Sequence, residues 1–327
     1  MKNKRIYFIT ILAFLSIGLM SSFVWGFYAH QLINRLAVYT LPDEMIGFYK
    51  ANIDYVTENA VNPDRRRYAV EGEAPRHYID LDYYTEEVQK DLANLSWSKA
   101  VAKYTEDTLN AYGVVPWHVV RMKFQLTEAF AKKDLRNILR ISADVGHYIA
   151  DAHVPLHTTE NYNGQLTDQL GIHGFWESRL PELYTKDYSF WVGKADYIEN
   201  IHTRIWDVVL SSHACLDSVF GFEKELTLKM GEDKKFAVGE RNGRTVREYS
   251  KDFSKRFHKM LDGQVEKRMR SSVKTVGDFW YTCWVDAGQP DLDDLGTFDF
   301  EKSEEEIELK KAWLRQILKV RKEADDS

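Results

Sequence analysis

A stretch near the middle of the chain combines a helical pattern with residue types that bind metals: GHYIADAHVPLH at residues 146–157, followed by HGFWE at residues 173–177. Upstream, apolar residues recur at helical spacing from Ile138 to Ala152. This pattern predicts a helix that carries His147 and Asp151 one turn apart on a common face. A single ion would therefore be able to contact both side chains.

The residues after this helix extend the candidate site. Pro155 disfavours continuation of the helix, so we expect His157 on a turn at its C-terminal end, where the chain can bring a third ligand back. His173 and Glu177 repeat the one-turn spacing. We expect a polar loop, residues 158–172, to join the two ligand-bearing helices.

The rest of the chain is also mainly helical in pattern. Apolar spacing predicts helices at residues 25–37, 42–59, 97–111, 116–133, within about 190–220, and up to about 284. Asn62-Pro63-Asp64 indicates a turn or loop. Strand-like alternation is scarce, so we expect an all-α fold. Residues 25–285 would form one helical domain, and residues 286–327 a linker followed by an amphipathic C-terminal helix at 303–322.

The first 24 residues follow the order of a secretory signal peptide. Three basic residues within positions 2–5 precede a mostly apolar run at residues 7–20, and Ser21 and Ser22 follow. We therefore expect residues 1–24 to be removed and the protein to be exported, to the periplasm or the extracellular space. An uncleaved membrane anchor is the alternative, although the run is shorter than the about 20 apolar residues that usually span a bilayer.

Composition sets broader limits on the fold and on the partners. The 327-residue chain is 44% hydrophobic and 13% aromatic, which is enough apolar surface for one large domain or two modest ones and excludes overall disorder. Its net charge of −6 disfavours a broad polyanion-binding surface. Bound dications can nevertheless attract phosphate locally. Nothing in the sequence indicates a stable protein partner, and we expect a monomer.

Only two cysteines are present, Cys215 and Cys283. An exported protein enters a compartment where disulfides persist, so these two residues are a candidate disulfide. Two buried thiols are the alternative. Neither cysteine lies in a Cys-x-x-Cys pattern, and we give them no metal role.

The candidate metal site rests on the set of donors, because a lone histidine on a helix is usually structural. The candidate ligands within residues 147–177 supply imidazole nitrogens and carboxylate oxygens without a soft ligand; they are His147, Asp151, His157, His173 and Glu177. This donor set suits zinc better than copper(I) or a cluster. Catalytic zinc sites keep one position open for water or substrate.

The spacing His147-x3-Asp151-x5-His157, then His173-x3-Glu177, resembles the signature of the zinc-dependent phospholipase C and single-strand-specific nuclease superfamily. The resemblance covers about residues 25–185 and implies an α-helical fold around three zinc ions. In that family the mature N-terminal Trp binds one ion through its amino nitrogen and carbonyl oxygen, assisted by a nearby His. The remaining family positions, an upstream Asp and a later His, also have matches here. The matching residues are Trp25, His30, Asp64 and His77.

By this resemblance, the ligands divide among three ions. Asp64, His77, His147 and Asp151 would hold one; His157, His173 and Glu177 a second; and Trp25, His30 and a bridging Asp151 the third. A free α-amino group has a pKa of about 8, well below that of lysine, so a freed terminus offers a neutral nitrogen to a metal. A tryptophan within the chain cannot do this.

The reaction implied by the resemblance is metal-assisted hydrolysis of a phosphodiester by in-line displacement. Asp64 is the candidate catalytic residue, because it would orient or deprotonate the attacking water while it ligates an ion. Tyr78 and Asn163 are candidate substrate-binding residues. Tyr78 would stack on a base or line a headgroup pocket, with core packing as the alternative. Asp144 is a candidate partner for a ligand imidazole, although a solvated carboxylate is the favoured interpretation.

Both branches of the superfamily remain open. Glu177 resembles the phospholipase C branch, since the nucleases more often have Asp there, whereas the step from Trp25 to His30 resembles the nuclease branch. We favour a phospholipase C-like enzyme, with a single-strand-specific nuclease as the alternative. A third interpretation is an exported, non-catalytic, zinc-stabilised binding domain. An open cluster disfavours it, because structural zinc sites are usually closed by four ligands.

Cleavage of the signal peptide decides whether Trp25 can act as a ligand. We expect the exported protein to begin at Trp25, since only a free amino group there supplies the nitrogen donor. N-terminal sequencing and intact mass measure this directly. A chain that begins at Phe23, after cleavage at Ser22, would place that nitrogen in an amide bond and contradict the ligand set of the third ion.

Overall fold

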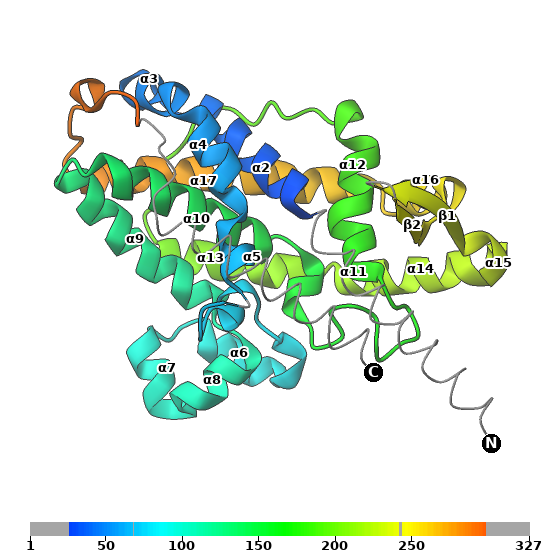
Figure 1. Ribbon diagram of the computed structural model, residues 1–327. Helices are drawn as coiled ribbons and strands as arrows, with labels where there is room; N and C mark the ends of the chain where they lie inside the picture. Colours follow the sequence, from blue (N-terminus) through cyan, green and yellow to red (C-terminus); the bar gives the residue numbers. More distant parts are fainter. Residues whose placement is uncertain (1–25, 68, 242–243, 299–327) are drawn as a thin grey trace, which may run out of the picture.

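The computed structural model of the chain describes residues 26–298, apart from residues 68 and 242–243, as a mainly α-helical protein (Figure 1). The expected signal peptide at 1–24, the expected ligand Trp25 and the expected terminal helix at 303–322 lie outside the described residues. The all-α class is confirmed for the described part, in which the only sheet is a two-stranded antiparallel hairpin. None of the described helices is long and apolar enough to cross a membrane.

The α-helices differ widely in length. They are α2 (Gly26–Ala37), α3 (Asp43–Ala51), α4 (Ile53–Glu58), α5 (Asn62–Arg66), α6 (Glu86–Leu92), α7 (Trp97–Tyr104), α8 (Glu106–Tyr112), α9 (Val115–Ala131), α10 (Leu135–Ala152), α11 (Ile172–Gly174), α12 (Leu180–Tyr184), α13 (Ile201–His213), α14 (Leu216–Met230), α15 (Glu232–Lys235), α16 (Lys251–Met260) and α17 (Gln264–Asp286).

Shorter elements connect these helices. The 3₁₀ turns are η2 (Val38–Thr40), η3 (Asn59–Val61), η4 (Ala74–His77), η5 (Leu81–Tyr83), η6 (Pro155–Thr158), η8 (Thr185–Asp187) and η9 (Asp293–Leu295), and η7 (Phe175–Arg179) is a π-helical turn. The hairpin pairs β1 (Phe236–Arg241) with β2 (Arg244–Tyr249), with Phe236 opposite Tyr249.

Helix α10 is the centre of the core. It packs against α2, α9, α13 and α17, and Figure 1 shows α9, α10 and α17 running alongside one another. From Ile141 to Ala152 every residue of α10 is buried, including His147 and Asp151. Buried polar groups of this kind are costly unless they are paired, so the neighbouring elements must supply partners for them.

The structure corrects the predicted loop at residues 62–64. Pro63 lies in the first turn of α5, a position that tolerates the missing N–H, so Asp64 lies on a short helix. Two predicted helices are each divided in two. Residues 42–59 break at Asn52 between α3 and α4, and residues 97–111 break at Thr105, whose hydroxyl oxygen accepts from the Thr108 N–H and caps α8.

The candidate disulfide between Cys215 and Cys283 is not formed, and both thiols are free. Cys283 is buried on α17, with its Sγ 3.7 Å from the carbonyl oxygen of Lys123 on α9. Cys215 lies in the turn between α13 and α14, where its Sγ is 3.3 Å from the carbonyl oxygen of Ser211. The alternative of two free thiols therefore holds, with Cys283 buried and Cys215 partly buried.

Close packing around Gly146 provides a stability test of the core. A Cβ atom at this α10 position would lie 2.0 Å from Oδ1 of Asn34, whose amide donates to the carbonyls of Val56 and Ala143. Gly146→Ala should therefore lower the free energy of unfolding by about 1–3 kcal/mol, as overpacking does. Urea denaturation measures the change.

A matched control lies on α3. A Cβ atom at Gly47 would meet nothing within 4 Å, so Gly47→Ala should raise the free energy of unfolding by about 0.5–1 kcal/mol. The same effect from both substitutions would contradict the close approach of α2 and α10.

Candidate metal centre

The predicted ligands within the described residues converge on one place, although they come from seven elements. They are His30 on α2, Asp64 on α5, His77 at the end of η4, His147 and Asp151 on α10, His157 on η6, His173 on α11 and Glu177 on η7. Their donor atoms form three groups, within each of which the atoms lie within 4.8 Å of one another. The groups are His30/His147/Asp151, Asp64/His77/His147 and His157/His173/Glu177, and each could hold a metal ion.

Asp151 connects these groups because its two carboxylate oxygens face different histidines. Oδ2 lies 2.9 Å from His77 Nδ1 and 3.2 Å from His147 Nε2. Oδ1 lies 3.4 Å from His30 Nε2 and 3.8 Å from His157 Nε2. This division of the two oxygens is the arrangement that a carboxylate bridging two ions needs.

The two oxygens of Glu177 also face histidines of different groups, and its contact with His30 was not predicted from the sequence. Its Oε2 lies 2.6 Å from His173 Nε2 and 3.4 Å from His157 Nε2, within the expected group. Its Oε1 lies 3.4 Å from His30 Nε2. His30 therefore lies between two carboxylates, Asp151 and Glu177.

Asp64, on α5, completes the group that also contains His77 and His147. Its Oδ1 lies 3.6 Å from His147 Nε2 and 3.8 Å from His77 Nδ1. Its side chain is 20% exposed, whereas Asp151 is 1% exposed. Of these two carboxylates, Asp64 is thus the one that solvent can reach.

Backbone carbonyls fix the orientation of two imidazoles. His147 Nδ1 donates to the Ala60 carbonyl at 2.9 Å, and His157 Nδ1 donates to the His77 carbonyl at 2.7 Å. Each bond leaves Nε2 as the free nitrogen that faces the carboxylates. A second hydrogen bond of this kind is how proteins orient histidine ligands of metals.

The protein's own groups leave this cluster incompletely satisfied, which fits a metal site. His30 Nε2 and His77 Nδ1 face the carboxylates, and the opposite nitrogens of these two buried rings have no hydrogen-bond partner. His147 Nε2 and His77 Nδ1 face each other at 3.1 Å. Within the described part of the chain, the ion-pair contacts of Asp151 and Glu177 involve histidines and no Lys or Arg. Buried carboxylates of this kind call for a cation.

The buried carboxylates and imidazoles of the cluster shift one another's pKa values. Burial lowers the pKa of His147, but Asp151 and Asp64 outweigh it and raise that pKa to about 9. Burial also works against the charge of Asp151, yet His147 and His157 hold its pKa well below the usual range. Glu177 behaves similarly because hydrogen bonds from His157 and His173 outweigh its burial and lower its pKa. The carboxylates therefore stay ionised and available as ligands.

Asp144 has a role other than the one expected from the sequence. It is buried, and its carboxylate accepts from both terminal nitrogens of Arg66, at 3.3 and 3.0 Å, instead of facing solvent or a ligand imidazole. The expectation was wrong because Arg66, on the neighbouring α5, reaches it. This ion pair ties α5, the helix of Asp64, to α10.

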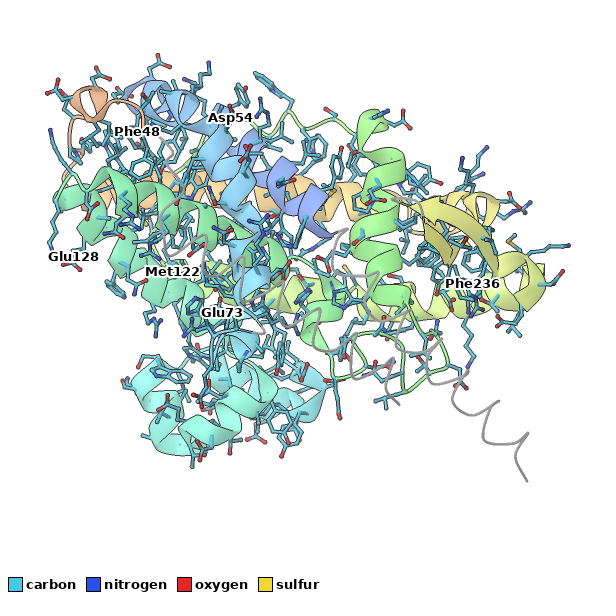
Figure 2. All side chains as sticks on the ribbon, in the orientation of Figure 1. Phe48, Asp54, Glu73, Met122, Glu128 and Phe236 are labelled. Carbon is cyan, nitrogen blue, oxygen red and sulfur yellow. The ribbon has the colours of Figure 1, made fainter. Side chains whose placement is uncertain are left out.

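Glu73, labelled in Figure 2, supports the site from behind His77 and was not predicted. It is 1% exposed and accepts from Arg76 at 2.6 Å and from the Tyr148 hydroxyl. Its Oε1 lies 3.9 Å from His77 Nε2, the unpaired ring nitrogen. The sequence carries no signal for this residue, which stands in the polar stretch Glu71-Gly72-Glu73.

A cavity of about 470 Å³ opens beside the ligands. Both candidate substrate-binding residues, Tyr78 and Asn163, line it. The lining residues are Gly26, Asp64, Arg67, Tyr78, Asp80, Asp151, Leu156, His157, Thr159, Glu160, Tyr162, Asn163, Gln165, His173, Gly174, Glu177 and Ser178. Burial, followed by Asp82 and Glu160, raises the pKa of Asp80 to about 7. The described part of the chain after residue 178 contributes no lining residue.

A scan against protein-family models and a search of curated proteins find no match to this chain. The interpretation of the site therefore rests on the geometry of its own residues.

Substitution of Asp151 tests whether one carboxylate serves two groups. Asp151→Asn should cost more than one metal ion per chain, because the amide offers a single weak oxygen donor where the carboxylate presents two. Elemental analysis of the purified protein, with circular dichroism as a check of folding, measures this. Asp54→Asn, at an exposed position on α4, is the control and should keep the full metal content. Full retention of metal in Asp151→Asn would contradict the bridging role.

Proposed function

We propose that this protein is an exported zinc-dependent phosphodiester hydrolase of the phospholipase C kind. The proposal is carried by the split contact of Asp151, whose two oxygens face different histidines beside one cavity. Imidazole nitrogens and carboxylate oxygens without a thiolate suit zinc. Export rests on the signal-like order of residues 1–24.

The chain's own residues would divide the work of hydrolysis. Asp64 lines the cavity and is the more exposed of the two carboxylates near His147, so it would orient the attacking water and accept its proton. Asp151 and Glu177 would act as ionised ligands, the form in which a carboxylate offers both of its oxygens. Bound zinc would supply positive charge at the phosphate oxygens and acidify water.

The other cavity residues favour a headgroup that carries positive charge. Asp80 and Glu160 provide carboxylates in the lining, and Tyr78 and Tyr162 provide aromatic rings. Carboxylates together with aromatic rings attract quaternary or primary ammonium groups. The same carboxylates would repel a polyanionic strand, against which Arg67 is the one lining residue with a Lys or Arg side chain among those described. These observations support a phospholipid over a nucleic acid.

The nuclease alternative keeps one observation in its favour. Tyr78 and Tyr162 both line the cavity and would also serve as stacking platforms for bases. The non-catalytic interpretation is weaker, because the three donor groups adjoin an open cavity and are not closed individually by four protein ligands.

One preparation separates the three interpretations. Zinc-loaded protein should cleave a chromogenic choline phosphodiester and phosphatidylcholine, lose this activity with a chelator and regain it with added zinc. Asp64→Asn should lower kcat by about 10²–10⁴-fold, the range for a positioned general base. Asp54→Asn is the control and should be unaffected, because this side chain is 85% exposed and lies on α4.

The outcomes of this assay differ clearly. Cleavage of single-stranded DNA without cleavage of either choline ester would select the nuclease. Fewer than two zinc ions per chain together with no chelator-sensitive cleavage of any diester would leave the binding domain.

A further inference from the structure

The loop between the two ligand-bearing segments forms one wall of the cavity. Thr159, Glu160, Tyr162, Asn163 and Gln165 all line it. A polar surface loop of this length is usually mobile, so the contacts that fix its backbone also fix the wall. We call residues 159–171 the wall loop.

The start of the wall loop is held by Asp82. Its Oδ2 accepts from the Thr159 hydroxyl at 2.6 Å, and its Oδ1 accepts from the Glu160 N–H at 3.0 Å. The middle of the loop is folded upon itself at Gly164, which has a φ of 75°. A Cβ atom there would lie 2.3 Å from the carbonyl oxygen of Gln169. Gln169 therefore packs directly against the turn at Gly164.

Gln169 is anchored in the protein interior by α14. Its side chain is buried, and Nε2 donates to Glu223 Oε2 at 2.5 Å and to the Phe220 carbonyl at 2.9 Å. Glu223 is fully buried on α14. A hydrogen bond to a charged acceptor is stronger than one between neutral groups, so this contact should contribute strongly to holding the second half of the loop.

Glu223 is itself held by the hairpin region. Its Oε1 accepts from Lys235 Nζ at 2.7 Å and from the Tyr249 hydroxyl at 3.1 Å. Lys235 is buried at the end of α15, with its ammonium 5.4 Å from the ring centroid of Phe236, which Figure 2 labels. Both oxygens of this buried carboxylate are thus satisfied, which is the condition for burying an ion pair without a large penalty.

The hairpin also contacts the ligand turn directly. The Tyr249 ring stacks on Phe175 with centroids 3.8 Å apart, and Phe175 lies between the ligands His173 and Glu177. Figure 1 shows α14, α15 and the hairpin at one end of the molecule, next to α11 and α12. The Tyr249 hydroxyl connects this stack to Glu223.

We propose that Glu223 is a positioning residue for the cavity wall. Through Gln169 it fixes the loop that carries Tyr162 and Asn163, and through Lys235 it is oriented by the hairpin region. The hairpin and α14 thereby act on the site although no described residue after 178 lines the cavity. The kinetic part of this proposal rests on the proposed hydrolase function, whereas its structural part does not.

Hydrogen exchange of the metal-loaded full chain is the first test. Glu223→Gln removes the charge while keeping the shape, and Gln169→Leu removes the contact while keeping the ion pair. Both variants should speed amide exchange in residues 159–171 by about tenfold to a hundredfold, the equivalent of one hydrogen bond to a charged group. Exchange in α10 and zinc content should be unchanged. Glu225→Gln, at an exposed pair with Lys229 on the same helix, is the control and should change nothing.

A double variant separates positioning from stability. Glu223→Leu with Lys235→Met replaces the ion pair by apolar side chains, which often preserves or raises stability. Glu223→Gln leaves Lys235 buried without its partner and should lower the midpoint of thermal unfolding, and the double variant should restore that midpoint. Amide exchange in the wall loop should nevertheless remain fast, because Gln169 still lacks its charged acceptor. Restoration of loop protection by the apolar pair would overturn the proposal, since Glu223 would then serve packing alone. Unchanged exchange in Gln169→Leu would overturn it as well.

The kinetic test uses the soluble choline diester. Glu223→Gln and Gln169→Leu should raise KM about tenfold while kcat changes much less, since the loop would bind substrate without supplying metal ligands. A fall in kcat at constant KM would contradict a role for the wall in binding. If the wild-type protein cleaves no diester, the proposed function fails, and the exchange experiments alone decide the role of Glu223.

Discussion

The Asp151 carboxylate is the group on which the arrangement of the whole site depends. It is buried at the C-terminal end of α10, where an ionised group costs several kcal/mol unless it is compensated. Four imidazoles compensate its charge: His77 and His147 lie near one oxygen, and His30 and His157 lie near the other. Elements α2, η4 and η6 therefore meet at α10, and the donor groups that they form there could hold metal ions.

The parts of this site that sequence could predict are those that lie within one turn of the chain. His147 and Asp151, like His173 and Glu177, are four residues apart, and helical geometry alone brings each pair together. Asp64 and His77 are a different case. No periodicity relates them to α10, so their place was available only through the resemblance to a known family, and the structure brings them to His147 by tertiary packing. The contact between Glu177 and His30 joins two segments far apart in the chain, which explains why local patterns did not reveal it.

The residues that sequence missed are charged residues that become buried. Glu73, Glu223 and Lys235 stand in polar stretches whose pattern indicates solvent exposure, yet each is at most 3% exposed. Their burial depends on partners far away in the sequence, such as Tyr148 for Glu73 and Gln169 for Glu223. The hairpin escaped prediction for a related reason, since two short polar strands are marginal alone and depend on packing such as that between Tyr249 and Phe175.

Net charge is a poor guide to the substrate of such a site, because the sign of the field changes over a few side chains. Bound dications would reverse the potential at Asp64 and Asp151 and attract a phosphate, in a chain whose net charge is −6. Glu160, in the lining but outside the three donor groups, would keep its negative field, and Asp80 would add to it above its pKa of about 7. In a zwitterionic diester the phosphate and the ammonium group are close together. The phosphate would meet the bound dications while the ammonium group meets the lining carboxylates. A nucleic acid strand places further phosphates where those carboxylates lie, which is why we favour the phospholipid.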